Sequence, residues 1–283
     1  MIKNQKLKQL TINLERPSLG SLLHYKQKGS DYMALMRVNF YSKVLGKHHH
    51  FNLILPEDDS HYEIEKENKL LPSLMILHGL SSDNNSYLRF TSVERYANDY
   101  GVAIILPDGD HSFYANMKYG HSYEDHILEV WAYAHKVFPL SLKREDNYLA
   151  GHSMGGFGAI KTSFEHPELF SKACYMSAAT NLERMINYDW QDFKVAGIIG
   201  DVSTTKGTEL DITAIIEKGI ASNNLPELYI MCGTEDELHS DNLKFVETLR
   251  SKGVKLKFED GPGEHDYAYW DQGIKKALEW MSN

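Results

Sequence analysis

The sequence predicts an α/β protein with a mostly parallel central sheet and helices on both faces. Six short segments read as strands, namely 73–77, 102–106, 147–150, 173–176, 228–232 and 254–258, and the first two are apolar runs typical of buried strands. Helical spacing is found in the segments that lie between or after them: 87–99, 123–138, 154–164, 241–250 and 267–281. Strands that alternate with helices pair in parallel, because each helix carries the chain back across the sheet.

The remaining segments predict additions to this central unit. Residues 36–42 and 49–55 read as two strands of an antiparallel hairpin. Residues 1–32 lack clear periodicity and predict a loosely ordered N-terminal arm, so that 33–283 form a single domain. Residues 180–224 interrupt the alternation without a clear strand and predict a small cap-like insertion. Its apolar residues suit either a cover over a site or a contact in a homo-oligomer: Leu182, Met185, Ile186, Tyr188 and Trp190.

Composition narrows the classes of partner. With 42% hydrophobic and 24% charged residues among 283, the chain is able to bury a substantial core. Its net charge of −9 argues against a nucleic-acid partner, because phosphate binding needs a basic face. No stretch approaches the about 20 apolar residues that span a bilayer, and no secretory signal pattern is present, so we expect a cytoplasmic location. Cys174 and Cys232 lie in apolar strands and are expected to be reduced thiols.

A nucleophile motif follows one of the predicted strands. Residues 151–155 read Gly-His-Ser-Met-Gly and match the pattern G-x-S-x-G. An apolar strand enters this motif and a helix rich in small residues leaves it. In that setting a serine hydroxyl is exposed on a sharp turn, and the two glycines avoid collisions with neighbouring backbone. We therefore predict Ser153 as the nucleophile of an α/β-hydrolase fold.

A serine becomes a good nucleophile when a base takes its proton, and a histidine is suitably placed for this task. In the α/β-hydrolase fold the base follows the nucleophile and the acid along the chain, on a loop after a late strand. His265 lies in such a loop, after the strand predicted at 254–258. His239 lies in the acid segment itself, and His166 lies at a helix end. We therefore predict His265 as the base.

The acid of the triad is expected on the loop that follows the strand at 228–232. Three carboxylates stand there in a row: Glu235, Asp236 and Glu237. Asp236 is favoured because its side chain is the shorter one and because it stands three residues after Gly233, where the loop turns back. Its two neighbours suit a solvated loop.

An oxyanion hole requires two backbone N–H groups that face the developing negative charge. One is expected from Met154, which follows the nucleophile. The other is expected from Leu80, in the His-Gly-Leu loop after the strand at 73–77. Gly79 in this loop is predicted to contact the substrate. His78 is expected to hold the loop through hydrogen bonds and not to act as a base.

The substrate side is predicted near the loop at 108–114, which follows a strand at the carboxyl edge of the sheet. Phe113 and Tyr114 are expected to wall an acyl pocket, although packing beneath the loop suits them equally well. Asp108 and Asp110 lack a third ligand nearby in the sequence, so they are interpreted as hydrogen-bonded loop acids. We therefore predict no metal site at this loop.

Three motifs resemble those of the esterase D-like serine esterases, most closely the tributyrin esterases. They are the segments 151–159, 232–236 and 263–270, which occur in the correct order. The resemblance covers about 33–283 and implies a cytoplasmic hydrolase of short-chain acyl esters without a metal or organic cofactor. The related S-formylglutathione hydrolases typically carry a histidine where this chain has Phe157, which favours a simple esterase.

The resemblance and the motifs together predict a serine carboxylesterase that forms an acyl-enzyme with a small-molecule ester. The same broad group includes feruloyl and carbohydrate O-acetyl esterases, so an acetylated sugar is one possible substrate. S-formylglutathione hydrolase is a further alternative. An acyltransferase with the same triad and a non-catalytic binding module of hydrolase ancestry are weaker ones, and the intact triad argues against the latter.

Overall fold

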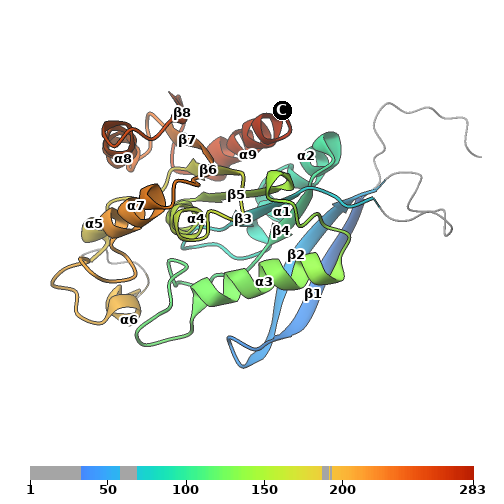
Figure 1. The fold of residues 1–283 in the computed structure, drawn as a ribbon, viewed down its shortest axis with the longest axis horizontal. Coiled ribbons are helices and arrows are strands. Elements are labelled where there is room, and N and C mark those ends of the chain that lie inside the picture. The colour runs from blue at the N-terminus through green and yellow to red at the C-terminus, as the bar shows by residue number, and fades with distance from the viewer. Residues whose placement is uncertain (1–32, 58–68, 187–190, 192) are drawn as a thin grey trace, which may run out of the picture. The chain divides into compact units, whose positions relative to one another are not determined.

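An eight-stranded sheet lies at the centre of the structure, a computed structural model that describes residues 33–57, 69–186, 191 and 193–283. Its order is β1-β2-β4-β3-β5-β6-β7-β8 (Figure 1). The strands are β1 (Met33–Ser42), β2 (Lys47–Pro56), β3 (Ser73–Leu77), β4 (Ala103–Leu106), β5 (Asn147–His152), β6 (Lys172–Met176), β7 (Glu227–Gly233) and β8 (Leu256–Gly261). From β4 to β8 all neighbouring strands pair in parallel. The predicted fold class is thereby confirmed.

Helices cover both faces of this sheet. They are α1 (Ser86–Phe90), α2 (Val93–Tyr100), α3 (Tyr123–Val137), α4 (Met154–Glu165), α5 (Leu182–Ile186), α6 (Ala196–Ile199), α7 (Ile212–Ala221), α8 (His239–Ser251) and α9 (Tyr267–Met281), with a 3₁₀ turn η3 (Arg144–Asp146). Buried residues of α3, α4, α7 and α8 form the core on one face, and those of α1, α2 and α9 form the core on the other. In Figure 1, α1, α2 and α9 lie on one side of the sheet and α3 on the opposite side.

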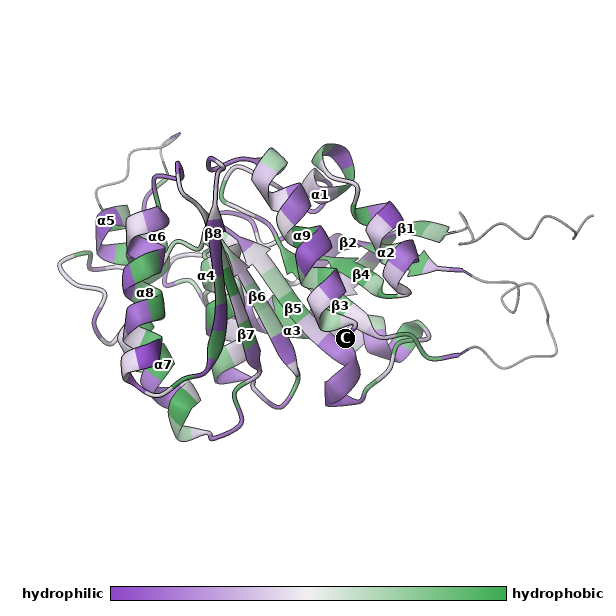
Figure 2. Ribbon diagram, turned by 90° about the horizontal axis from the view of Figure 1, so that it is seen from above, coloured by the Kyte–Doolittle hydropathy of each residue, from purple (hydrophilic) through white to green (hydrophobic). Residues whose placement is uncertain are grey.

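The two cores follow from the alternation of side chains along each strand. Met75 and Leu77 of β3 belong to one core, whereas Leu74 and Ile76 belong to the other. Successive residues of a strand point to opposite faces, so a strand covered on both sides is apolar throughout. Figure 2 shows this as hydrophobic colour on the central strands, while the helices alternate between hydrophobic and hydrophilic residues. Burial of each large apolar side chain contributes about 1.5–3 kcal/mol.

The predicted hairpin is present but longer than expected. Strands β1 and β2 pair antiparallel over ten residues each, and Ser42 opposes Lys47. The predicted helix at 87–99 is divided into α1 and α2, because Thr91 has an extended backbone. The Thr91 hydroxyl donates to the Tyr87 carbonyl at 2.5 Å and accepts from the Val93 N–H at 3.2 Å. These side-chain bonds replace backbone bonds of a continuous helix.

The described part of the insertion at 180–224 contains α5, α6 and α7 and no strand. Helix α7 packs on α4, where the Phe164 ring lies against Gly219. Only part of the insertion is therefore free to cover a site. The predicted arm at 1–32, and Tyr188 and Trp190 of the predicted cap, lie outside the described residues.

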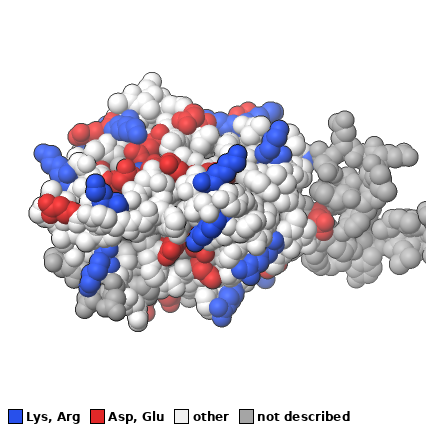
Figure 3. Space-filling view, turned by 90° about the horizontal axis from the view of Figure 1, so that it is seen from below, with Lys and Arg blue, Asp and Glu red and all other residues white. Residues whose placement is uncertain are grey.

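Surface charge on the face drawn in Figure 3 is mixed, with acidic and basic side chains interspersed. Among the described residues, no helix has both the length and the apolar character needed to cross a bilayer.

Candidate active site

Ser153 stands on a strained turn between β5 and α4. Its backbone angles are φ 54° and ψ −120°, a conformation that residues other than glycine rarely adopt. The turn is fastened to the end of β6, because the Ser153 N–H donates to the Met176 carbonyl at 3.0 Å. A Cβ at Gly155 would lie 2.1 Å from the Leu77 carbonyl oxygen, so this position of the motif requires glycine. The strand–turn–helix geometry keeps the Ser153 hydroxyl accessible to the pocket.

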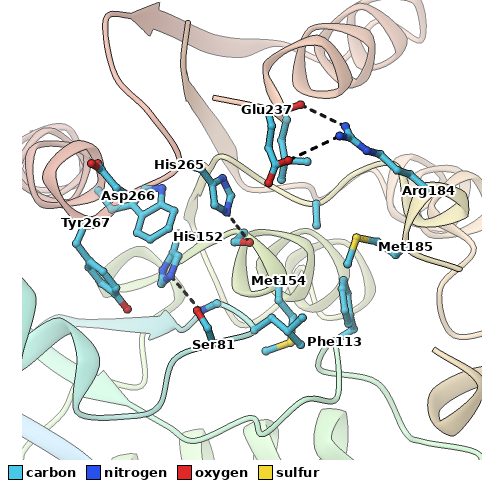
Figure 4. Close-up of a pocket in the computed structure, with 16 residues that line it drawn as sticks. Ser81, Phe113, His152, Met154, Arg184, Met185, Glu237, His265, Asp266 and Tyr267 are labelled. Atoms are coloured by element: carbon cyan, nitrogen blue, oxygen red, sulfur yellow. Dashed lines mark hydrogen bonds and ion pairs between the residues drawn. The ribbon is translucent and has the colours of Figure 1, made fainter. Parts of the chain in front are cut away.

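Three loops at the carboxyl ends of strands bring the predicted triad together. The Ser153 Oγ lies 3.0 Å from the His265 Nε2. The His265 Nδ1 lies 2.9 Å from one oxygen of Asp236 and 3.1 Å from the other. Figure 4 shows the His265 ring directed into the pocket, with a dashed line toward the serine. A continuous hydrogen-bonded chain thus joins one hydroxyl, one imidazole and one carboxylate.

The environment of Asp236 keeps its carboxylate ionised. Burial acts to raise the pKa of Asp236, but the hydrogen bond and charge of His265 outweigh it, and the net pKa lies below the usual value. The Ser177 hydroxyl and the Leu238 N–H, which lies 2.8 Å from the carboxylate, add to this lowering. An ionised acid at this place orients the imidazole and stabilises its protonated form.

The alternatives to Asp236 have other partners. Glu235 accepts a hydrogen bond from the Gly263 N–H at 2.6 Å and is exposed to solvent. Glu237 is exposed as well, and its carboxylate lies 3.8 Å from the Arg184 guanidinium. Both neighbours are therefore loop residues, as the sequence indicated.

The alternative histidines are similarly engaged elsewhere. The His239 Nε2 lies 3.0 Å from the Asp260 carboxylate. The His166 Nε2 lies 3.5 Å from the Glu124 carboxylate. Neither histidine lines the pocket that contains Ser153.

Both predicted oxyanion donors border the same pocket as Ser153. Met154 is the first residue of α4, and the N–H of a first helical residue has no partner within its helix. The Gly79 N–H donates to the His152 Nε2 at 3.1 Å, so it is not available to a substrate. Leu80 then supplies the next N–H along this loop. Gly79 itself lines the pocket.

His78 holds the loop and has no place in the triad. It is buried, its Nδ1 donates to the Gly79 carbonyl at 2.8 Å, and its Nε2 accepts from the Gly109 N–H at 2.9 Å. A neutral imidazole with its proton on Nδ1 satisfies both bonds.

The two aromatic residues predicted to wall the pocket differ in position. Phe113 lines the pocket. Tyr114 is fully buried outside the pocket lining, and its hydroxyl donates to the His78 carbonyl at 2.8 Å. The chain turns sharply here, with φ near 52° and 54° at these two residues, and the Tyr114 ring packs against Gly109 and Gly158. Tyr114 therefore supports the loop from beneath, which was the second of the two expectations.

The pocket has a volume of about 340 Å³ and two different walls. Figure 4 shows Phe113, Met154 and Met185 on one side of the pocket and Tyr267 on the opposite side. Arg184 of α5 and Glu237 of the loop after β7 also line the pocket. A pocket of this size is at the lower end of the range for small-molecule sites.

Sequence reasoning missed several residues that contact the triad. Trp270 lines the pocket, and its ring lies edge-on to His265 with centroids 4.9 Å apart. Ser177 directly follows β6 and bonds to Trp270. His152 lies within the nucleophile motif and bonds to the oxyanion loop. The signals were present, since each follows a strand or belongs to one of the motifs.

The acids considered as metal ligands are engaged in hydrogen bonds. Asp108 accepts from the Asp110 N–H at 3.0 Å, and Asp110 accepts from the Tyr123 hydroxyl at 2.9 Å. Within the described residues, no group of three or more histidines, cysteines and acids is arranged to hold a metal ion. Cys174 and Cys232 are buried free thiols.

Comparison with known proteins agrees with this geometry. A model described as "putative esterase" matches residues 42–281. A fluorophosphonate-binding serine hydrolase of Staphylococcus aureus, solved with substrate bound, is 49% identical, with a TM-score of 0.86 over 89% of this chain and 99% of that one. An S-formylglutathione hydrolase of the same organism is also 49% identical, with a TM-score of 0.83 over 89% and 100%.

A curated relative carries a different name. The acetyl esterase of Caldicellulosiruptor saccharolyticus is 29% identical over 263 residues, which cover 88% of this chain and 98% of the relative. The family match spans most of the chain and includes all three triad residues. The chain therefore belongs to this esterase family, and it is a carboxylic ester hydrolase with an α/β-hydrolase fold.

Proposed function

We propose that the chain hydrolyses short-chain acyl esters, with Ser153 as nucleophile, His265 as base and Asp236 as acid. The observation that carries this proposal is the unbroken chain of hydrogen bonds, 3.0 Å from Ser153 to His265 and 2.9 Å from His265 to Asp236. This is the arrangement in which a base removes the proton of a serine hydroxyl.

The reaction has two halves. His265 removes the proton of Ser153 as the Oγ attacks the ester carbonyl, and the N–H groups of Leu80 and Met154 stabilise the oxyanion. The protonated His265 then donates this proton to the leaving alcohol, and an acyl-enzyme remains. Water, activated by the same imidazole, attacks the acyl-enzyme and releases the acid. Asp236 stays ionised and holds the ring throughout.

The pocket supports a short acyl group. Its side formed by Phe113, Met154 and Met185 is apolar, and Met185 belongs to α5 of the insertion. We propose that this part of the insertion acts as a partial cap that limits acyl length. The name of the acetyl esterase relative is consistent with a short acyl group. A small-molecule ester as the partner and a cytoplasmic location complete the proposal.

Hydrolysis of graded p-nitrophenyl esters, from acetate to palmitate, tests the function. We expect the highest kcat/KM at two to four acyl carbons and a decline with longer chains. Ser153→Ala should abolish both turnover and labelling by a fluorophosphonate probe. Undiminished turnover by that variant would remove Ser153 from the mechanism, and a steady rise in kcat/KM toward palmitate would contradict the cap.

S-formylglutathione hydrolysis is a second candidate, because one of the two solved structures at 49% identity bears that name. The same triad cleaves esters and thioesters. Phe157, where those hydrolases typically carry histidine, argues for the simple ester. Parallel kcat/KM values for S-formylglutathione and for a neutral acetyl ester decide between the two. A thioester preference of a hundredfold or more would assign the second function.

A further inference from the structure

A buried imidazole stands next to the nucleophile and takes no part in the proposed proton transfers. His152 precedes Ser153 and is only 1% exposed. Its ring lies against Trp270 with centroids 4.0 Å apart, and edge-on to Tyr267 and Tyr87 at 5.2 and 5.3 Å. Three aromatic rings therefore fix the orientation of this imidazole.

Both ring nitrogens of His152 are hydrogen-bonded, and the partners determine its protonation. The Gly79 N–H lies 3.1 Å from the Nε2, and the Tyr87 hydroxyl lies 2.8 Å from the Nδ1 (the dashed line from His152 in Figure 4 marks the former bond). A backbone N–H only donates, so the Nε2 must carry a lone pair. The proton of the neutral ring then resides on Nδ1 and is donated to Tyr87.

The electrostatic surroundings favour this neutral form. Burial lowers the pKa of His152 well below its ordinary value, and positive charge on His265 lowers it further. His265 becomes charged during each catalytic cycle. A neutral neighbour avoids repulsion at that moment, and it keeps the Nε2 lone pair available to Gly79.

The bond from Gly79 lies beside the proposed oxyanion donor. Each peptide group is planar, so its C=O and N–H point in opposite directions. The peptide between His78 and Gly79 is held at both ends, by Tyr114 at its C=O and by His152 at its N–H. The next peptide is held at its C=O, where Gly79 accepts from the His78 Nδ1. Its N–H, which belongs to Leu80, is thereby directed by its neighbours.

Steric fit supports the same contact. A Cβ at Gly79 would lie 2.7 Å from the His152 Nε2 and 3.3 Å from the Ser153 Cβ. The loop therefore approaches the nucleophile motif as closely as a glycine allows. A shift of either partner changes the distance between the Leu80 N–H and the carbonyl oxygen attacked by Ser153.

We propose that His152 is a positioning residue of the oxyanion hole, which holds the Gly79 peptide so that the Leu80 N–H faces the developing oxyanion. The inference rests on the esterase mechanism proposed above. It assigns a task to the second residue of the nucleophile motif, which takes part in none of the proton transfers of that mechanism.

The test compares an oxoester with its thionoester, in which sulfur replaces the carbonyl oxygen. An oxyanion accepts hydrogen bonds far better than a thiolate, so an intact oxyanion hole favours the oxoester. In His152→Leu we expect kcat for the oxoester to fall about tenfold to a hundredfold, since loss of an entire donor costs about 10²–10³. KM should change little. The kcat for the thionoester should fall by a smaller factor, so that the ratio of the oxoester kcat to the thionoester kcat decreases.

Two further variants separate positioning from general damage. His152→Gln keeps an acceptor near the place of the Nε2. Its ratio of oxoester to thionoester kcat should therefore lie between those of His152→Leu and the wild type. His126→Leu removes a buried histidine of α3 that does not line the pocket, and it should leave the ratio unchanged. If His152→Leu does not fold, Tyr87→Phe removes the acceptor of the Nδ1 proton and should reduce the ratio to a smaller extent.

An unchanged ratio in the folded His152 variant, or in Tyr87→Phe if that is the one that folds, would overturn the inference. So would a His152→Gln variant that loses as much of the ratio as His152→Leu. Inactivity of the wild-type protein toward every ester would instead contradict the proposed function. The two failures are therefore distinguishable.

Discussion

The indole N–H of Trp270 donates to the Ser177 Oγ at 3.1 Å, and Ser177 in turn bonds to the Asp236 carboxylate. Because Ser177 accepts from Trp270, its own proton is directed to the stronger remaining acceptor, the carboxylate. The hydrogen-bonded chain thus continues behind the acid to a residue that also contacts His265. Ser177 is fully buried and has a positive φ of 45°.

Replacement of this serine tests whether the extension matters for catalysis. In Ser177→Ala, Asp236 loses one donor and the Trp270 N–H loses its acceptor. We expect a loss of about 1–3 kcal/mol in the free energy of unfolding and a fall of about tenfold in kcat, measured by thermal unfolding and ester hydrolysis. Ser163→Ala is the matched control, since Ser163 is a buried serine that bonds to the Tyr175 hydroxyl at 2.6 Å. Equal kcat values in the two variants would show that the extension is only structural.

The loop around Gly79 should not tolerate a side chain. In Gly79→Ala the new methyl group would meet His152 and Ser153, so the loop must move away from the nucleophile. We expect kcat to fall by at least tenfold, with a smaller change in KM. Gly261→Ala serves as the control, because a Cβ at Gly261 has no neighbour within 4 Å. A Gly79→Ala variant with the activity of the control would mean that the loop relaxes without cost.

The proposed triad could be assigned from the sequence because its positions follow from topology. In a parallel sheet the loops after successive strands meet at one edge, so the order of Ser153, Asp236 and His265 along the chain already indicates that they converge. The direction of the loop turns Asp236 toward His265 and leaves Glu235 and Glu237 exposed. This direction depends on a close approach, since a Cβ at Gly233 would lie 2.0 Å from the Gly263 carbonyl.

Features set by contacts distant in sequence were not predictable. Periodicity predicts one helix at 87–99, but Thr91 divides it into α1 and α2. Tyr87 of α1 bonds to His152, which lies 65 residues later in the sequence. The inward turn of Tyr114 depends on space left by Gly158 in another element. Local sequence patterns contain no information on such partners, whereas the nucleophile motif can be recognised from five consecutive residues.

A buried ionic cluster predicts how stability depends on pH. Lys161 of α4 is 2% exposed, and its ammonium lies 2.6 Å from Glu124, 2.5 Å from Glu165 and 3.1 Å from Glu209 of the insertion. Burial acts to raise the pKa of Glu165, but the hydrogen bonds and charge of Lys161, with a hydrogen bond from Lys218, lower it to about 2. A carboxylate whose pKa is lowered by folding stabilises the fold at pH values above its ordinary pKa, which is 4.5 for this residue.

We therefore expect the contribution of Glu165 to be lost as the pH falls from about 4.5 to about 2. Denaturant unfolding at a series of pH values measures this. Glu165→Gln should flatten the curve within that window. Lys161→Met, which removes the buried cation that three carboxylates share, should cost about 3–5 kcal/mol at neutral pH. A Lys161→Met variant as stable as the wild type would contradict the importance of the cluster.

The last prediction concerns acyl length. Met185 is half-buried and lines the pocket on the side of Phe113 and Met154. Truncation in Met185→Ala creates room for additional methylene groups, each of which contributes about 0.8 kcal/mol when buried, or about fourfold in kcat/KM. Against p-nitrophenyl esters from acetate to octanoate, the optimum should move to longer chains, while Met36→Ala, a half-buried methionine of β1 outside the pocket, keeps the original optimum. If Met185→Ala weakens all esters by the same factor, Met185 supports the wall without limiting its depth, and the limit on chain length must lie with Phe113 or Met154.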